Sequence, residues 1–164
     1  MRVRCVARCD LGVPSSASLF PRPGGVVRNP VQVAYLNNVY GGSLIACAVE
    51  VERWRAASGS VALRWGGGRD TVELVRLGVS ELLGNVAKHV ENPRCYLRMA
   101  RIGAEVTVQV FDRSVRMPVL AQQAPGWDAE SGRGLWMLRE MADGFGCERT
   151  LRCVGKIVWF RCAL

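Results

Sequence analysis

The sequence has few of the side chains that hold metals or anchor a chain in a membrane. Its 164 residues include one histidine, and its seven cysteines form no C-x-x-C pair, so a structural zinc site is not expected. No apolar run approaches the roughly 20 residues of a membrane span, and no apolar stretch follows the N-terminal arginines as in a secretory signal. We therefore expect a cytoplasmic protein with reduced thiols and no membrane contact.

Lysine is also scarce, because nearly all of the positive charge is arginine. The 22 basic and 14 acidic residues leave a formal charge of +8, but the basic residues are spread along the chain and form no stripe. Direct nucleic-acid binding is therefore not expected, since only the net positive charge supports the hypothesis that the protein binds DNA. The length and the hydrophobic content of 49% predict one globular domain.

The first 40 residues differ in composition from the rest. Proline, serine and glycine interrupt every candidate periodic element between residues 14 and 30. We interpret residues 1–40 as a flexible or loosely packed extension, with one candidate strand at 31–40, and residues 41–164 as a single domain.

Apolar periodicity predicts the elements of that domain. Spacings of three and four build an apolar stripe over residues 70–90, which predicts a helix with Asp70 as its N-cap. The other expected elements are mixed helical character at 44–65, a hairpin of strands 95–101 and 105–111, a loop at 114–131, a helix at 133–142 with Leu135, Leu138 and Met141 facing inward, and strands at 147–153 and 156–163. This order predicts an α/β fold, a two-layer sandwich of a mainly antiparallel, mixed sheet with helices on one face.

One face of the predicted helix at 70–90 is polar. Glu81, Asn85 and His89 follow one another at intervals of four residues, opposite the valine stripe. Such a face is either an ordinary solvated surface or part of a site. Asparagine is a poor helix former, and the helix is apolar enough to be covered on more than one side. Both observations favour a site, but the spacing alone leaves the two interpretations open.

Two further polar or glycine-rich features follow along the chain. Asp112 comes directly after a predicted strand, where an aspartate is commonly a turn former or a cap. Residues 132–135 (GRGL) lead into the next helix, and a glycine turn before a helix N-terminus suits phosphate. They complete neither of the common glycine-rich phosphate-loop patterns, so taken singly they are equally a loop-to-helix cap.

Taken together, these segments resemble the nucleotide-binding boxes of the superfamily that contains gyrase, histidine kinases and mismatch-repair ATPases. Residues 81–89 (ELLGNVAKH) resemble its N box, residues 110–118 its first glycine box, and residues 132–135 its second. The tail, residues 142–160, is similar to the closing strands of one branch, the small stand-alone anti-sigma factor serine/threonine kinases. The resemblance covers residues 45–163 and implies the histidine-kinase-like ATPase fold, also called the Bergerat fold.

The resemblance implies ATP and Mg²⁺ as cofactors. Asn85 suits Mg²⁺, which needs few protein oxygens, and the resemblance makes Glu81 the catalytic general base. Asp112 is an acceptor-only group that suits the exocyclic amine of adenine and would reject guanine. The other ATP-binding residues that it implies are Lys88, Ser114, Gly132, Arg133, Gly134 and Leu135, of which Lys88 is equally interpretable as a solvated helix residue.

Two positions depart from the pattern of the branch. Ser114 stands where the first glycine box has the glycine of D-x-G, and Ile157 stands where the last glycine-threonine motif has threonine. We expect each change to weaken nucleotide binding without abolishing it. The loss of one hydrogen bond reduces the free energy of binding by about 0.5–1.5 kcal/mol.

The resemblance also implies a function and partners. We expect an ATP-binding anti-sigma regulator that phosphorylates a serine of an anti-sigma antagonist and sequesters a sigma factor, as a homodimer. The alternative is a nucleotide-binding regulatory protein without kinase activity, which the changes at Ser114 and Ile157 keep open. A histidine-kinase fragment is a further alternative, but it needs a phosphoacceptor histidine on a dimerisation helix, and the single histidine, His89, lies in the N box.

Overall fold

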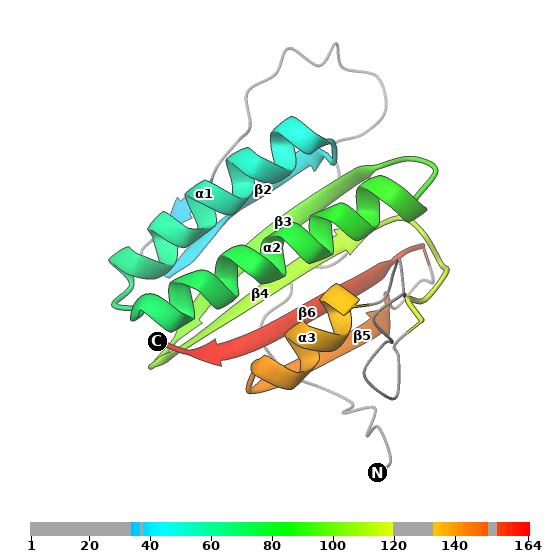
Figure 1. Cartoon of the computed structure of the whole chain (residues 1–164). Helices are drawn as coiled ribbons and strands as arrows, with labels where there is room; N and C mark the ends of the chain where they lie inside the picture. The colour runs from blue at the N-terminus through cyan, green and yellow to red at the C-terminus, as the bar shows by residue number, and fades with distance from the viewer. Residues whose placement is uncertain (1–33, 37, 120–132, 151–153) are drawn as a thin grey trace. The chain divides into compact units, whose positions relative to one another are not determined.

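Six strands form one antiparallel sheet in the part of the chain that the computed structural model describes, which is residues 34–36, 38–119, 133–150 and 154–164. The strands are β1 (Ala34–Leu36), β2 (Val39–Ile45), β3 (Arg94–Ile102), β4 (Glu105–Asp112), β5 (Gly144–Arg149) and β6 (Lys156–Ala163). They lie in the order β1-β2-β3-β4-β6-β5, and each neighbouring pair is antiparallel. Strand β6 therefore lies inside the sheet, between β4 and β5 (Figure 1).

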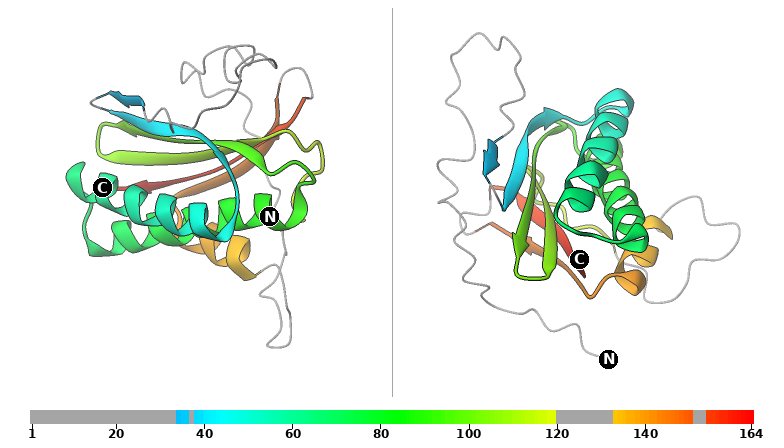
Figure 2. Two further views of the ribbon diagram at one scale, coloured as in Figure 1. Left: turned by 90° about the horizontal axis from the view of Figure 1, so that it is seen from above. Right: turned by 90° about the vertical axis from the view of Figure 1, so that its left-hand side faces the viewer.

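Three helices in the described residues cover one face of this sheet (Figure 2). They are α1 (Ala48–Arg64), α2 (Arg69–His89) and α3 (Arg133–Met141). Helix α1 packs beside α2 and over β2, α2 lies over β4 and β6, and α3 contacts α2 and β5. The predicted two-layer α/β sandwich with helices on one face is therefore confirmed, with antiparallel pairing throughout the described sheet.

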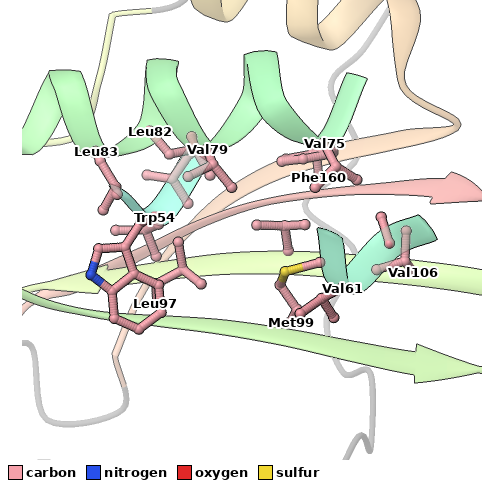
Figure 3. Packing of buried hydrophobic residues seen from close by; sticks show 14 of the residues in the cluster. Trp54, Val61, Val75, Val79, Leu82, Leu83, Leu97, Met99, Val106 and Phe160 are labelled. Atoms are coloured by element: carbon pink, nitrogen blue, oxygen red, sulfur yellow. The ribbon is translucent and has the colours of Figure 1, made fainter. Parts of the chain in front are cut away.

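The hydrophobic core lies between the helices and the sheet (Figure 3). Val75, Val79 and Leu83 of α2 are fully buried, and they meet an equally buried layer from the sheet that includes Leu97 and Phe160. Burying one such side chain contributes about 1.5–3 kcal/mol. The valine stripe predicted from the sequence is thus the core-facing side of α2.

The central hairpin and the long helix agree closely with the sequence prediction. Strands β3 and β4 pair in register around Gly103, whose φ of 60° belongs to the turn, and α2 begins and ends within one residue of the predicted bounds. The predicted N-cap of α2 is wrong, because Gly68 occupies that position. Asp70 lies in the first turn instead, where its negative charge is favourable to the helix dipole.

The helical character predicted from residue 44 is wrong at its start. Residues 39–45 form strand β2, and helix α1 begins only at Ala48. Glycine at position 41 makes the close pairing with β3 possible, because a β-carbon there would collide with the carbonyl oxygen of Leu97. The apolar run that suggests a helix is therefore the end of a strand followed by the start of a helix.

Two expectations near α3 are also corrected. Met141 does not face inward, since it is 59% exposed, whereas Leu135 and Leu138 are buried as predicted. Helix α3 ends at Met141 and the chain turns almost at once into β5, which leaves this side chain at the edge of the core. Strand β5 begins at Gly144 rather than at residue 147 for the same reason.

Strand β1 and the first residues of β2 precede residue 41, where the sequence places the start of the domain. Tyr40 is buried, and its ring centroid lies 5.7 Å from that of Trp54 in α1. Residues 1–33 lie outside the described residues, so the N-terminal extension stays a prediction. Within the described part of the chain, no helix has the length and apolar character needed to cross a membrane.

Candidate functional site

Helix α2 and strand β4 end, and strand β6 begins, at the same end of the sheet (Figure 1). The residues at this end line a cavity of about 380 Å³. Its wall also includes part of the segment 114–119, which has no helix or strand, and the first turn of α3. Ligand pockets in proteins typically measure about 300–1,000 Å³. The cavity therefore has room for a small ligand.

The cavity wall brings together most of the residues that the sequence singles out. Those in the wall are Glu81, Asn85, Asp112, Ser114, Gly134 and Leu135, together with His89. Lys88 and Arg133 are described but do not belong to this wall, and Lys88 is exposed. Gly132 lies outside the described residues. The three separate sequence features thus converge on one place in the fold.

Helix α2 supplies one side of the cavity through its polar face. Glu81, Asn85 and His89 lie one turn apart along this face, and all three line the cavity. The Nδ2 atom of Asn85 is buried and has no hydrogen-bond partner among the described residues. An unsatisfied buried polar group costs about 1–3 kcal/mol, and rotation of the amide would exchange Nδ2 with Oδ1. Asn85 is therefore free to serve a ligand group or a metal ion.

Helix α3 reaches the cavity through its first turn. Gly134 lies so close to Glu81 that a β-carbon at position 134 would collide with the Glu81 carboxylate. The N–H groups of a first helical turn have no partners within the helix and carry a partial positive charge. The contact therefore places a carboxylate from α2 beside the positive end of α3.

Strand β4 supplies Asp112 at its last position. The Asp112 side chain is only 1% exposed, and its Oδ1 accepts two hydrogen bonds, from the backbone N–H of Ser114 at 2.7 Å and from Nζ of Lys156 at 2.8 Å. Strand β6 can begin beside it only because residue 155 is glycine, since a β-carbon there would collide with the carbonyl oxygen of Asp112. Asp112 is thus a buried, charged group with a cation beside it.

Serine at position 114 is compatible with this turn. Its backbone N–H donates to Asp112, and its hydroxyl accepts a hydrogen bond from the backbone N–H of Arg116 at 3.2 Å. Side-chain oxygens of Asp and Ser commonly stabilise turns in this way. The departure from D-x-G therefore leaves an ordered turn at the mouth of the cavity.

Lys156 is the site residue that sequence reasoning missed. It lies directly opposite Asp112 in the pairing of β4 with β6, and its side chain lines the cavity. Ile157, which stands at the threonine position of the last motif, is not in the cavity wall, because successive side chains of a strand point to opposite faces. In the structure, residues 156, 158, 160 and 162 lie on the buried face of β6. Residues 157–160 (IVWF) are all apolar, so the sequence has no alternation that would assign Lys156 to that face.

Two thiols near Asp112 are protonated at neutral pH. Burial, reinforced by the negative charge of Asp112, raises the pKa of Cys95 to about 12. Burial also raises the pKa of Cys147 to about 11, although Lys156 acts in the opposite direction. A thiolate, not a thiol, is the strong nucleophile, so the raised pKa values make both side chains weak nucleophiles at neutral pH. The described residues also contain no group of three His, Cys, Asp or Glu side chains that could hold a metal ion.

Comparison with models of known protein families gives a match over most of the domain. The family model described as the histidine kinase-like ATPase domain matches residues 46–162, which includes α1 to α3 and strands β3 to β6. No curated protein matches the chain.

Proposed function

The chain belongs to the histidine kinase-like ATPase domain family, and we propose that within this family it is an ATP-binding anti-sigma regulator. The family match supports a nucleotide-binding regulatory domain. The observation that carries ATP binding is the convergence of Asn85, Asp112 and Gly134 from three separate elements on one cavity.

The residues of the cavity fit the groups that ATP and Mg²⁺ present. The buried Nδ2 of Asn85 has no hydrogen-bond partner among the described residues, and the amide oxygen would be one of the few protein ligands that Mg²⁺ needs. The Asp112 carboxylate would accept a hydrogen bond from the exocyclic amine of adenine, since only Oδ1 carries the two described bonds. The first turn of α3 at Gly134 suits phosphate.

We further propose that the protein is a serine/threonine kinase. Glu81 lies one helical turn from Asn85 and lines the same cavity. Its carboxylate would then lie near a metal held by Asn85 and would accept the proton of an attacking serine hydroxyl. The proposed protein substrate is an anti-sigma antagonist, and the proposed second partner is a sigma factor, bound by a homodimer in the cytoplasm. These partners rest on the resemblance of the tail, residues 142–160, to the closing strands of the anti-sigma factor kinases.

One observation favours the alternative, a nucleotide-binding regulator without kinase activity. The Glu81 carboxylate contacts the backbone of Gly134, and in this alternative its role is to hold α3 rather than to accept a proton. In that case nucleotide binding would shift α3, and the regulatory signal would be a change of shape alone.

Two measurements test the proposed function. Calorimetry with Mg-ATP and Mg-GTP should show binding of ATP that requires Mg²⁺ and exceeds binding of GTP. No heat from either nucleotide at millimolar concentration would contradict nucleotide binding. Affinity capture with the full chain, with and without Mg-ATP, should then return a sigma factor or its antagonist. Repeated capture of DNA or lipid and never of a transcription factor would contradict the anti-sigma role.

A further inference from the structure

The cavity wall contains a buried ion pair between Asp112 and Lys156, and the proposed function has so far given a role only to Asp112. Nζ of Lys156 lies 2.8 Å from Oδ1 of Asp112, and the two side chains are 9% and 1% exposed. Removing charged groups from water costs several kcal/mol per ion, which a buried pair recovers only with good geometry and further hydrogen bonds. The buried pair therefore requires a well-defined geometry, which holds the Lys156 ammonium group at one place in the cavity wall.

Both members of the pair retain hydrogen-bonding capacity. A lysine ammonium has three donors, and the structure describes one hydrogen bond from Nζ, to Asp112. A carboxylate has about four acceptor positions, and the described hydrogen bonds to Asp112 use only Oδ1. A donor and an acceptor thus stand side by side in the wall of a cavity that is otherwise lined there by Val110 and Val158.

We propose that Lys156 is a base-reading residue that donates a hydrogen bond to ring nitrogen N1 of adenine while Asp112 accepts one from the exocyclic amine. This inference rests on the proposed binding of ATP. Adenine presents a donor next to an acceptor on this edge, which matches an acceptor next to a donor in the wall. Guanine in the same orientation presents O6 to Asp112 and N1–H to Lys156, so both contacts become unfavourable. The base is then read at two atoms instead of one.

The proposal also explains why the loss of threonine from the last glycine-threonine motif, where the chain has Ile157, is compatible with binding of the base. The strand position that faces the cavity directly after Gly155 is occupied by Lys156, whereas Ile157 pairs with Phe111 and lies outside the cavity wall. A charged donor forms a stronger hydrogen bond than a hydroxyl, by roughly a factor of two. Isoleucine at position 157 therefore costs no contact to the base.

Calorimetry with two ligands tests the proposal: Mg-ATP, and Mg-1-deaza-ATP, in which a C–H group replaces N1. Hydrogen bonds to charged groups contribute about 1.5–3 kcal/mol, so the wild-type protein should bind ATP about 10- to 150-fold more tightly than the deaza analogue. Lys156→Met should weaken ATP and bind the two ligands equally. Lys156→Arg, which keeps a charged donor, should retain a preference for ATP. Arg69→Met, an exposed change at the other end of α2, should leave the wild-type preference unchanged.

Each outcome supports or overturns the proposal. Equal binding of the two ligands by the wild-type protein overturns it while leaving ATP binding intact. An equal loss for both ligands in Lys156→Met also overturns it, because Lys156 would then only hold Asp112 in place. Absence of ATP binding overturns this inference and the proposed function together. If thermal unfolding shows that Lys156→Met is not folded, the wild-type comparison of the two ligands decides alone.

Discussion

The carboxylate of Glu81 lies against the backbone of Gly134, where it occupies the space that a β-carbon would need. The contact joins the middle of α2 to the first turn of α3, and both residues line the cavity. Because the first turn of a helix carries a partial positive charge, the Glu81 carboxylate is attracted electrostatically to the N-terminus of α3 as well as packed against it. The position of α3 is therefore tied to the residue that we propose as the general base.

We predict that Gly134→Ala destabilises the protein and weakens ATP binding. The new methyl group would meet the Glu81 carboxylate, and overpacking of this kind typically costs about 1–3 kcal/mol. Urea unfolding and calorimetry would measure the two effects. Gly84→Ala is the matched control, because a β-carbon there meets nothing within 4 Å. In a helix interior this exchange should stabilise by about 0.5–1 kcal/mol. Equal behaviour of the two variants would rule out the close contact.

The Glu81→Gln variant should separate a kinase from a passive nucleotide binder. Glutamine keeps the shape of the side chain beside Gly134 but cannot accept the proton, so ATP should still bind while phosphoryl transfer falls about 10²–10⁴-fold. The assay uses radiolabelled ATP and a candidate antagonist. Glu73→Gln is the control, since Glu73 is an exposed residue of the same helix that pairs with Arg76. Unchanged labelling by Glu81→Gln, or no labelling by wild type that binds ATP, would favour the regulator without kinase activity.

Asp112→Asn should be far more destabilising than the loss of a surface carboxylate. It leaves the Lys156 ammonium buried without a counter-charge, and breaking a buried pair costs about 3–5 kcal/mol. Glu105→Gln is the comparison, because Glu105 pairs with Arg161 at 3.4 Å on an exposed part of the sheet, where such pairs contribute about 0–1 kcal/mol. The double variant Asp112→Asn/Lys156→Met should recover part of the loss. Equal urea midpoints for Asp112→Asn and Glu105→Gln would show that the pair is not buried in solution.

Stability should fall at alkaline pH because of the buried thiol of Cys95. Its pKa is raised to about 12 in the folded protein by burial and by Asp112, whereas an unfolded cysteine titrates near 8.5. The thiol therefore contributes its full stability below about pH 8.5, and this contribution is lost as the pH rises toward 12.

Urea unfolding at pH 8, 9.5 and 10.5 would measure this loss. The free energy of unfolding should fall less steeply in Cys95→Ala than in wild type, because groups other than Cys95 titrate in both proteins. Parallel curves for the two proteins would mean that Cys95 makes no such contribution.

The sequence predicts best what depends on local periodicity. The apolar stripe of α2 and the alternation of β3 and β4 are properties of consecutive residues, and both elements appear within about one residue of their predicted bounds. The sequence does not predict strand β2, because its place in the sheet depends on Gly41. Glycine at this position allows β3 to approach closely, since a β-carbon there would collide with the backbone of β3. That contact joins residues far apart in the sequence, which no local pattern reports.

The sequence predicts most members of the candidate site, although not Lys156, and it predicts none of their contacts. Polar residues on one face of α2 and an aspartate at the end of β4 are visible in the sequence, and the structure places them around one cavity. The pairing of Asp112 with Lys156 spans 44 positions and depends on the register of β4 with β6. A shift of one residue in a strand exchanges its two faces, so the register of β4 with β6 is needed to show that Lys156, and not Ile157, lines the cavity.

Strand β6 lies inside the sheet although it follows every other described strand in the chain. While a ribosome is still translating, β4 therefore presents an open edge, and β5 has no partner among the described strands until residues 156–163 emerge. Phe160, which fills the core, and Lys156, which completes the cavity wall, arrive with that segment. Open strand edges are templates for aggregation, so a nascent chain stalled before residue 156 should depend on chaperones. Nucleotide, if it assists folding, can act only after the ribosome has passed this point.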